Sequence, residues 1–135
     1  MPKYSVKRQF GNLGEKLAVQ FLMKRGHKIL EQNYLKPWGE IDIVGKKGDK
    51  YHFIEVKSVS GEIPKDVIHE TKKETGFRAE ENVHPHKLKR LYRTIETYLM
   101  EKSIENDWQL DVVTVKIDKN TKRATIEIIE NIVGE

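Results

Sequence analysis

A β-hairpin in the first half of the chain constrains the fold more than any other sequence feature. Residues 38–46 and 51–58 both read as strands, and Lys47-Gly48-Asp49-Lys50 between them has the composition of a tight turn. The two segments are therefore predicted to be neighbouring strands. Because side chains alternate across a strand with period two, this prediction also fixes which residues share a face.

The rest of the chain predicts two helices and three further strands. Residues 7–25 and 85–102 repeat apolar side chains at helical spacing: Phe10, Leu13, Leu17 and Phe21 in the first, and Leu88, Leu91, Ile95 and Leu99 in the second. Residues 27–35, 108–118 and 124–133 are predicted to be strands. The order α-β-β-β-α-β-β indicates a single α/β domain over residues 1–135, with a mixed β-sheet flanked by helices.

The segment from about residue 59 to residue 84 fits neither pattern. Gly61, Pro64 and Gly76 interrupt a run of mixed charges. So long an irregular segment is unusual in a compact domain. We expect it to contain a short helix or to be a mobile loop that a ligand orders.

The composition restricts the chemistry that the chain can perform. The absence of cysteine excludes disulfides, thiolate zinc sites and a cysteine nucleophile. No apolar stretch approaches the roughly 20 residues that span a bilayer, so we expect a soluble, cytoplasmic protein that does not bind membranes. The 25 Lys and Arg residues against 21 Asp and Glu residues give a net charge of +4, which permits binding to a polyanion.

Acidic side chains converge on one face of the predicted hairpin. Glu40 and Asp42 share a face of the first strand, and Glu55 and Lys57 share a face of the second. Either Asp42 or, after a slide of two residues, Glu40 then lies across from Glu55. The opposite face carries apolar residues: Ile41, Ile43, Ile54 and Val56.

Two close carboxylates in a half-buried pocket cannot comfortably both ionise without a cation. Mg²⁺ takes oxygen ligands and would relieve the repulsion between Asp42 and Glu55. The ammonium of Lys57 would then project beside the ion, where it could orient a water or steady charge on a phosphate. Glu15, on the margin of the first helix's apolar stripe, could point toward the same pocket. The alternative is a solvated sheet face tied by ordinary ion pairs.

The order of these motifs resembles the YraN-like family of uncharacterised proteins, which is similar to archaeal Holliday-junction resolvases within the PD-(D/E)xK nuclease superfamily. The resemblance rests on Gly11-Asn12-Leu13-Gly14-Glu15, Gly26 before a strand, Asn33-Tyr34, Gly39-Glu40-Ile41-Asp42-Ile43-Val44 and Phe53-Ile54-Glu55-Val56-Lys57. It implies a restriction-endonuclease-like fold in which Asp42, Glu55 and the Val56 carbonyl bind Mg²⁺, with Mn²⁺ as a substitute. It also implies catalytic roles for Lys57, as the lysine of the motif, and for Glu15, as the helix glutamate of the resolvase-like members.

Basic residues on the second helix are candidates for contacts with nucleic acid. Lys87, Arg90 and Arg93 lie off its apolar stripe, and Lys72, Lys73 and Arg78 precede them. Together they could follow a phosphate backbone, with Lys87 as the best single candidate for a substrate contact. The alternative is an ordinary solvated helix face.

These observations lead to one main hypothesis and two alternatives. The main hypothesis is a Mg²⁺-dependent endonuclease-like protein that hydrolyses DNA phosphodiesters, at branched or otherwise structured DNA, with resemblance to resolvases favouring a homodimer. A catalytically silent nucleic-acid-binding module with the same fold is the first alternative. A structural partner in a larger assembly is the second.

Histidines and one further aspartate receive weaker interpretations. His84-Pro85-His86 is better explained by a helix start than by a transition-metal site. His27, His52 and His69 are expected to be surface or strand residues. Asp111 lies in a strand rich in valine and either pairs with a basic residue or lies near the acidic site.

Overall fold

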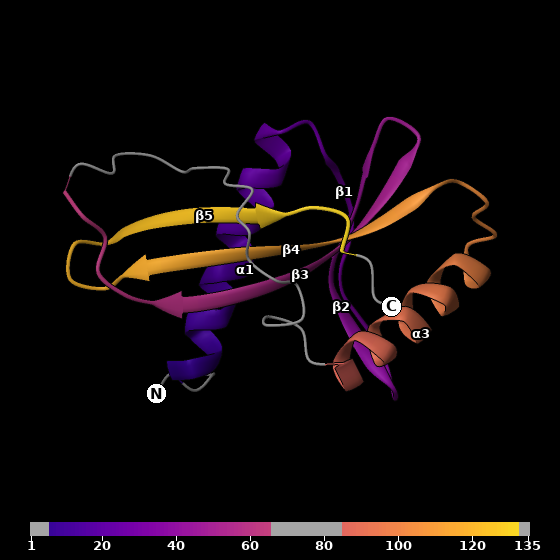
Figure 1. Cartoon of the computed structure of the whole chain (residues 1–135), viewed down its shortest axis with the longest axis horizontal. Coiled ribbons are helices and arrows are strands. Elements are labelled where there is room, and N and C mark those ends of the chain that lie inside the picture. Colours follow the sequence, from indigo (N-terminus) through magenta and orange to yellow (C-terminus); the bar gives the residue numbers. More distant parts are fainter. Residues whose placement is uncertain (1–5, 66–84, 133–135) are drawn as a thin grey trace.

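The computed structural model describes residues 6–65 and 85–132, which form one five-stranded mixed β-sheet and two helices (Figure 1). The elements are α1 (Val6–Lys24), β1 (Lys28–Lys36), β2 (Gly39–Lys47), β3 (Lys50–Ser60), α3 (Pro85–Glu101), β4 (Trp108–Asp118) and β5 (Arg123–Ile129). The predicted α/β class and the order α-β-β-β-α-β-β are confirmed.

The strands lie in sequence order, β1-β2-β3-β4-β5, and only the β3–β4 pair is parallel. The other three pairs are antiparallel. Parallel neighbours need a crossover, and the chain between β3 and β4 contains α3. The predicted hairpin of β2 and β3 is therefore part of a larger mixed sheet.

The helix α1 covers the face of the sheet formed by β3, β4 and β5 (Figure 1). The apolar stripe of the helix buries Ala18, Phe21 and Leu22 against Ile54 and Val113. Met23 in the same helix is exposed, as expected of a residue off the stripe. The first helix predicted from the sequence is amphipathic as expected, but Leu13, predicted to belong to its apolar stripe, is exposed.

The helix α3 packs on the other face and lies beside β2 (Figure 1). Leu91, Ile95 and Tyr98 in this helix are buried together with Val44 and Phe53. The ring of Tyr98 meets the ring of Phe53 edge-on, with 5.6 Å between centroids. The sheet therefore separates two apolar cores, and each core lies between the sheet and one helix.

The strands β2 and β3 separate at one end and form a fork. Their ladder of paired residues ends at Ile43 and Ile54, whereas β2 continues to pair with β1 as far as Gly39 and Lys36. Residues 39–42 therefore follow β1 away from β3. Any side chain just beyond Ile54 on β3 lies at the mouth of this fork.

The strict alternation expected of β2 is wrong at this fork. Ile41 packs in the core under α3 and Ile43 in the core under α1, although their spacing predicts a common face. Asn33, which the β1–β2 register places between the pairs Gln32–Ile43 and Tyr34–Ile41, has a left-handed backbone with φ of 54°. This interruption of β1, opposite Asp42, breaks the period of two.

Two predicted boundaries also need correction. The strand β3 runs to Ser60, so Val59 and Ser60 are not part of an irregular segment. The last strand ends at Ile129 and not at residue 133, because the left-handed φ of 56° at Asn131 turns the chain. The predicted helix or mobile loop, with Lys72, Lys73, Arg78, His69 and His84, lies largely outside the described residues.

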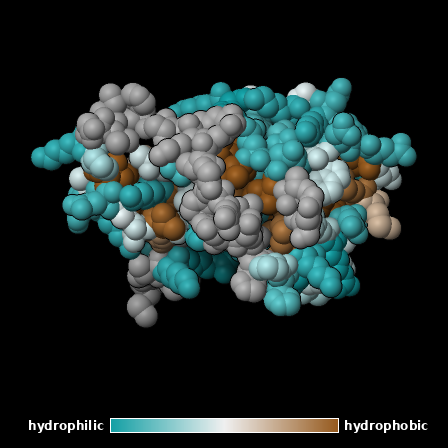
Figure 2. All heavy atoms as spheres, viewed as in Figure 1, coloured by the Kyte–Doolittle hydropathy of each residue, from teal (hydrophilic) through white to brown (hydrophobic). Residues whose placement is uncertain are grey.

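The described surface is mostly polar in the view of Figure 2, with apolar side chains gathered across the middle of that face. Neither helix in the described part of the chain is long and apolar enough to cross a membrane.

Candidate functional site

Asp42 and Glu55 face each other at the mouth of the fork. The register that pairs Ile43 with Ile54 brings Asp42 and Glu55 to the next opposed position, so the first of the two predicted registers is present. The backbone N–H of Val56 donates a 2.7 Å hydrogen bond to Oδ2 of Asp42. This bond holds the Asp42 carboxylate beside β3 although the two strands no longer pair there.

A cation from the opposite helix reaches the same place. Nζ of Lys87, at the start of α3, lies 2.7 Å from Oε1 of Glu55. Oε2 of Glu55 is buried and has no hydrogen-bond partner among the described residues. One oxygen of this carboxylate is thus neutralised by Lys87, and the other is buried without such a partner beside Asp42.

These side chains line a hollow of about 190 Å³ between the fork and α3. Its wall is formed by Gly39, Glu40, Asp42, Glu55, Lys87, Arg90 and Leu91. The hollow combines three carboxylates with two cations, which is the charge pattern of a site that binds a metal ion and a phosphate together.

Close packing at Gly39 explains why α3 comes so near. A Cβ atom on Gly39 would lie 2.5 Å from Oγ1 of Thr94 and 3.2 Å from the carbonyl oxygen of Arg90. Only glycine lets β2 and α3 approach this closely. Because Lys87 lies one turn before Arg90, this contact carries both cations to the hollow.

Gly14 has the corresponding role on the other face of the sheet. A Cβ atom at this position would lie 1.7 Å from Oγ of Ser58 on β3. The resulting close approach brings the next residue, Glu15, toward the fork from α1. Glu15 is half-buried, and its carboxylate hydrogen-bonds to the Asn33 side chain.

Burial and mutual repulsion raise the pKa values of the acidic residues. Burial, followed by the charge of Glu55, raises the pKa of Asp42 to about 8. Burial also raises the pKa of Glu55, with Lys87 acting in the opposite direction. The pKa of Glu15 is raised by burial and by the charges of Glu40 and Glu55. Four carboxyl groups from three elements therefore share one electrostatic environment.

The donor set fits a hard divalent cation that keeps part of its water shell. The orphaned Oε2 of Glu55 and the carboxylate of Asp42 are oxygen ligands of the kind that Mg²⁺ prefers. The described residues contain no group of three or more His, Asp or Glu side chains already arranged for a metal. A bound Mg²⁺ would therefore take the Asp42–Glu55 pair, the predicted Val56 carbonyl and water.

The remaining predicted residues are distributed around the site. Lys57 is exposed on β3 and does not line the hollow, where the ammonium group is that of Lys87. Arg90 lines the hollow, whereas the guanidinium of Arg93 stacks over the Trp38 ring, 4.3 Å from its centroid. The catalytic, metal-binding and DNA-binding roles of these residues stay predictions.

The expectation of surface or strand residues holds for His52, which lies in β3, and is wrong for His27, which is buried just before β1. Both are buried and their rings meet edge-on, and Nδ1 of His52 lies 2.8 Å from Oδ2 of the fully buried Asp111. Oδ1 of Asp111 accepts hydrogen bonds from Gln109 and from the backbone N–H of Asn131. Of the two alternatives for Asp111, pairing with a basic residue is therefore the one observed.

The buried cluster of His27, His52 and Asp111 could be recognised from the sequence only after its fold was known. Asp111 stands among valines where an apolar residue is expected, and an unpaired buried carboxylate is costly. Its partner His52 lies 59 residues earlier in the chain, so the parallel β3–β4 pairing had to be known first.

Comparison with known proteins gives a consistent result. Residues 14–115 match the model of the uncharacterised protein family UPF0102. A UPF0102 protein of Campylobacter hominis is 36% identical over 92% of this chain and 93% of its own length. UPF0102 proteins of Campylobacter concisus and Campylobacter jejuni subsp. jejuni strain 81-176 are 37% and 34% identical, over 91% and 90% of this chain and 92% and 91% of their own lengths.

Proposed function

The chain belongs to the uncharacterised protein family UPF0102, and from this premise and its acidic fork we propose that it is a Mg²⁺-dependent endonuclease-like protein. Its substrate would be a DNA phosphodiester. The observation that carries the proposal is the opposed pair of half-buried Asp42 and buried Glu55, with the orphaned Oε2 of Glu55 and the ammonium of Lys87 in the same hollow. Such an arrangement costs stability in a protein that does not use it.

Asp42 and Glu55 hold the ion in this proposal, and the Val56 N–H fixes the Asp42 carboxylate. When bound, Mg²⁺ lowers the pKa of a water molecule and offsets negative charge on the phosphate. In the hydrolysis the water oxygen bonds to phosphorus, one P–O ester bond breaks, and a proton is delivered to the departing alkoxide.

The cations of α3 bind the phosphate. With a divalent ion bound at Glu55, the ammonium of Lys87 would be free to bind a phosphate oxygen together with Arg90. Lys57 and Glu15 do not line this hollow and are proposed, from the family resemblance, as candidates for proton transfer and for placing the water. This division of roles explains why cations and carboxylates share one hollow.

The proposed substrate is branched or otherwise structured DNA. Symmetric cleavage of a four-way junction needs two sites, so we propose that the protein acts as a homodimer. Analytical ultracentrifugation with and without a four-way junction tests this part of the proposal. A stable monomer on the junction would contradict it.

The decisive experiment measures cleavage of duplex, flap and four-way DNA with Mg²⁺ or Mn²⁺. Wild type is expected to cut at least one of these substrates, and Asp42→Ala and Glu55→Gln to lose activity at least about a hundredfold, the scale of lost transition-state stabilisation. Glu96→Gln, an exposed change on α3, serves as the control. If wild type and Asp42→Ala are equally inert while both bind DNA, the protein is no nuclease.

One observation favours the second candidate, a catalytically silent nucleic-acid-binding module. Lys87 already neutralises Glu55 without a metal, and a permanent ion pair would leave no cation site. In that case neither Mg²⁺ nor Ca²⁺ would change the melting temperature, and DNA binding would depend on Arg90 and not on Asp42.

A further inference from the structure

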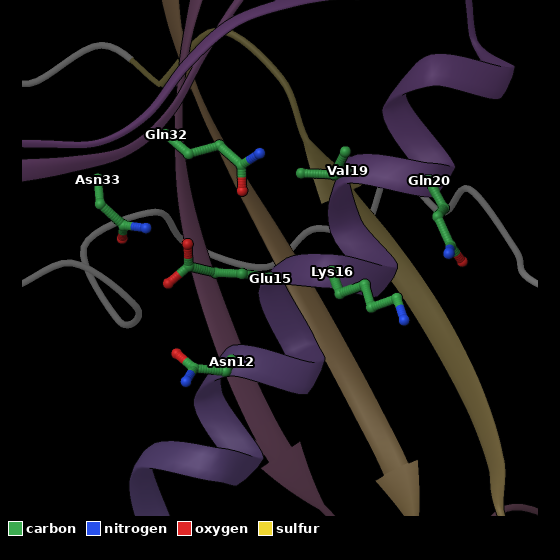
Figure 3. Close-up of a pocket in the computed structure, with 7 residues that line it drawn as sticks. All are labelled: Asn12, Glu15, Lys16, Val19, Gln20, Gln32 and Asn33. Carbon is green, nitrogen blue, oxygen red and sulfur yellow. The ribbon is translucent and has the colours of Figure 1, made fainter. Parts of the chain in front are cut away.

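A second, larger hollow lies between α1 and β1, and of the residues that line it only Glu15 enters the chemistry described above. It has a volume of about 400 Å³, within the range of small-ligand sites. Its lining is rich in side-chain amides: Asn12 and Gln20 from α1, and Gln32 and Asn33 from β1. Figure 3 shows the polar ends of Asn12, Gln32 and Asn33 gathered around the carboxylate of Glu15.

The chemistry of this amide pocket (Asn12, Glu15, Gln32 and Asn33) selects a neutral ligand with both donors and acceptors. Each carboxamide donates and accepts hydrogen bonds. The Glu15 carboxylate repels a phosphate, and the one cation of the lining, Lys16, points away from this group in Figure 3. The edges of nucleobases are recognised by side chains of this kind, with Asn and Gln pairing to adenine and Glu accepting from amino groups.

The amide pocket adjoins the acidic fork. The β1–β2 register places Asn33 opposite Asp42, and Glu15 is close enough to Glu40 and Glu55 for their charges to raise its pKa. Asn33 keeps a left-handed backbone inside a strand, which is unusual for a residue other than glycine. The amide pocket is on the α1 side of the sheet and the hollow of Lys87 and Arg90 on the α3 side, so a DNA strand held at the fork would have a polar hollow near its cleavage point.

We propose that the amide pocket receives an unpaired nucleobase of the DNA strand held at the acidic fork. This inference rests on the proposed function: a nucleobase is the expected ligand only if a DNA phosphodiester is bound at the neighbouring acidic fork. A base in a duplex is stacked and paired and cannot enter such a hollow, so the ligand is a nucleotide that a branch point has already released. The pocket thus supplies a reason for preferring structured DNA.

The test is an abasic scan of a forked DNA, read as binding affinity by fluorescence anisotropy in Ca²⁺. Removing one base near the branch is expected to weaken binding by wild type about fivefold to tenfold, the value of one or two hydrogen bonds. The Gln32→Ala variant should bind the complete forked DNA less tightly than wild type by the same factor. Removal of the base should then not weaken its binding further. Asn12→Ala, from the opposite wall, is the second variant, and Asn120→Ala in the exposed β4–β5 turn is the control.

The outcomes separate this inference from the proposed function. If every abasic position is neutral, or if Gln32→Ala and wild type lose the same affinity at each position, the amide pocket binds no base, while DNA binding and cleavage can still stand. If wild type binds no form of DNA, the proposed function fails and this inference with it. A melting temperature of Gln32→Ala equal to that of wild type excludes unfolding as the cause.

Discussion

Stability and the proposed activity oppose each other at Asp42. The pKa of this carboxyl is raised from 3.8 in the unfolded chain to about 8 in the fold, first by burial and then by Glu55. A raised carboxyl pKa leaves stability intact below about pH 4 and reduces it as the pH rises toward 8. The metal-free protein therefore becomes less stable over this window because of Asp42.

We expect Asp42→Asn to raise the melting temperature of the metal-free protein at pH 8. The amide keeps an acceptor for the Val56 N–H and removes the buried charge, with a gain on the order of 2 kcal/mol that disappears near pH 4. Mg²⁺ should stabilise wild type by mass action but not this variant. Scanning calorimetry from pH 4 to 8 measures both effects, with Asp49→Asn in the exposed β2–β3 turn as the control. A lower melting temperature at pH 8 would contradict the electrostatic account.

Lys87 should compete with a metal ion for Glu55. In Lys87→Met the positive charge at 2.7 Å from Oε1 is lost, and we expect Mn²⁺ to bind about threefold to tenfold more tightly, which corresponds to about 1 kcal/mol. Cleavage should fall at the same time, because the phosphate loses a cation. Calorimetric titration of Lys87→Met and of Lys89→Met, an exposed neighbour on α3, tests the first effect. Equal Mn²⁺ affinities of wild type, Lys87→Met and Lys89→Met would show that Lys87 does not compete with the metal ion for Glu55.

Each helix depends on one glycine to approach the fork, and α1 offers an internal comparison. Gly11 has open space where a Cβ would be added, whereas a Cβ at Gly14 would meet Ser58 of β3. The two positions lie three residues apart in the same helix, so their helix propensity is alike. Any difference between them reports the contact with the sheet.

Gly11→Ala is expected to stabilise the protein by about 0.5–1 kcal/mol, the usual gain of alanine over glycine within a helix. Gly14→Ala is expected to destabilise it by about 1–3 kcal/mol, because the added methyl group overpacks the α1–β3 contact. Urea unfolding of both variants gives the two values. The double variant Gly14→Ala, Ser58→Gly should recover most of the lost stability. If it does not, the destabilisation by Gly14→Ala does not come from the contact with Ser58.

At the scale of the whole molecule, the positions of the charged side chains matter more for DNA binding than the net charge. The net charge of +4 is modest, but Lys87 and Arg90 stand at the acidic hollow, with Arg93 one turn beyond Arg90. Binding of DNA to such a surface should depend on salt, because each neutralised phosphate releases counterions. The salt dependence therefore counts the phosphate contacts.

Arg90→Ala should reduce the slope of log affinity against log salt concentration by about 1, the value of one phosphate contact on duplex DNA. Arg93→Ala should have a smaller effect, since its guanidinium already stacks on Trp38. Lys28→Ala, at the far end of the β1–β2 ladder, is the control. Anisotropy titrations between 50 and 200 mM salt, about the range over which such contacts are resolved, give the slopes. An unchanged slope for Arg90→Ala would remove α3 from the DNA-binding surface.

Local patterns in the sequence determined the elements, their order and the pairing of the hairpin. The apolar spacing in α1 and α3 and the turn at residues 47–50 depend on near neighbours, so they can be read without the fold. The sequence narrowed the residue opposite Glu55 to Asp42 or Glu40, and the register observed in the sheet decided for Asp42.

Only the tertiary structure decided what surrounds those carboxylates. The contact of Lys87 with Glu55 joins residues 32 positions apart on different elements, and the pairing of His52 with Asp111 spans 59 positions. The fork itself arises because β2 follows β1 and leaves β3, which no period of two in one strand can reveal. Period and turn chemistry are local properties of a chain, whereas burial and charge neighbourhood are properties of its packing.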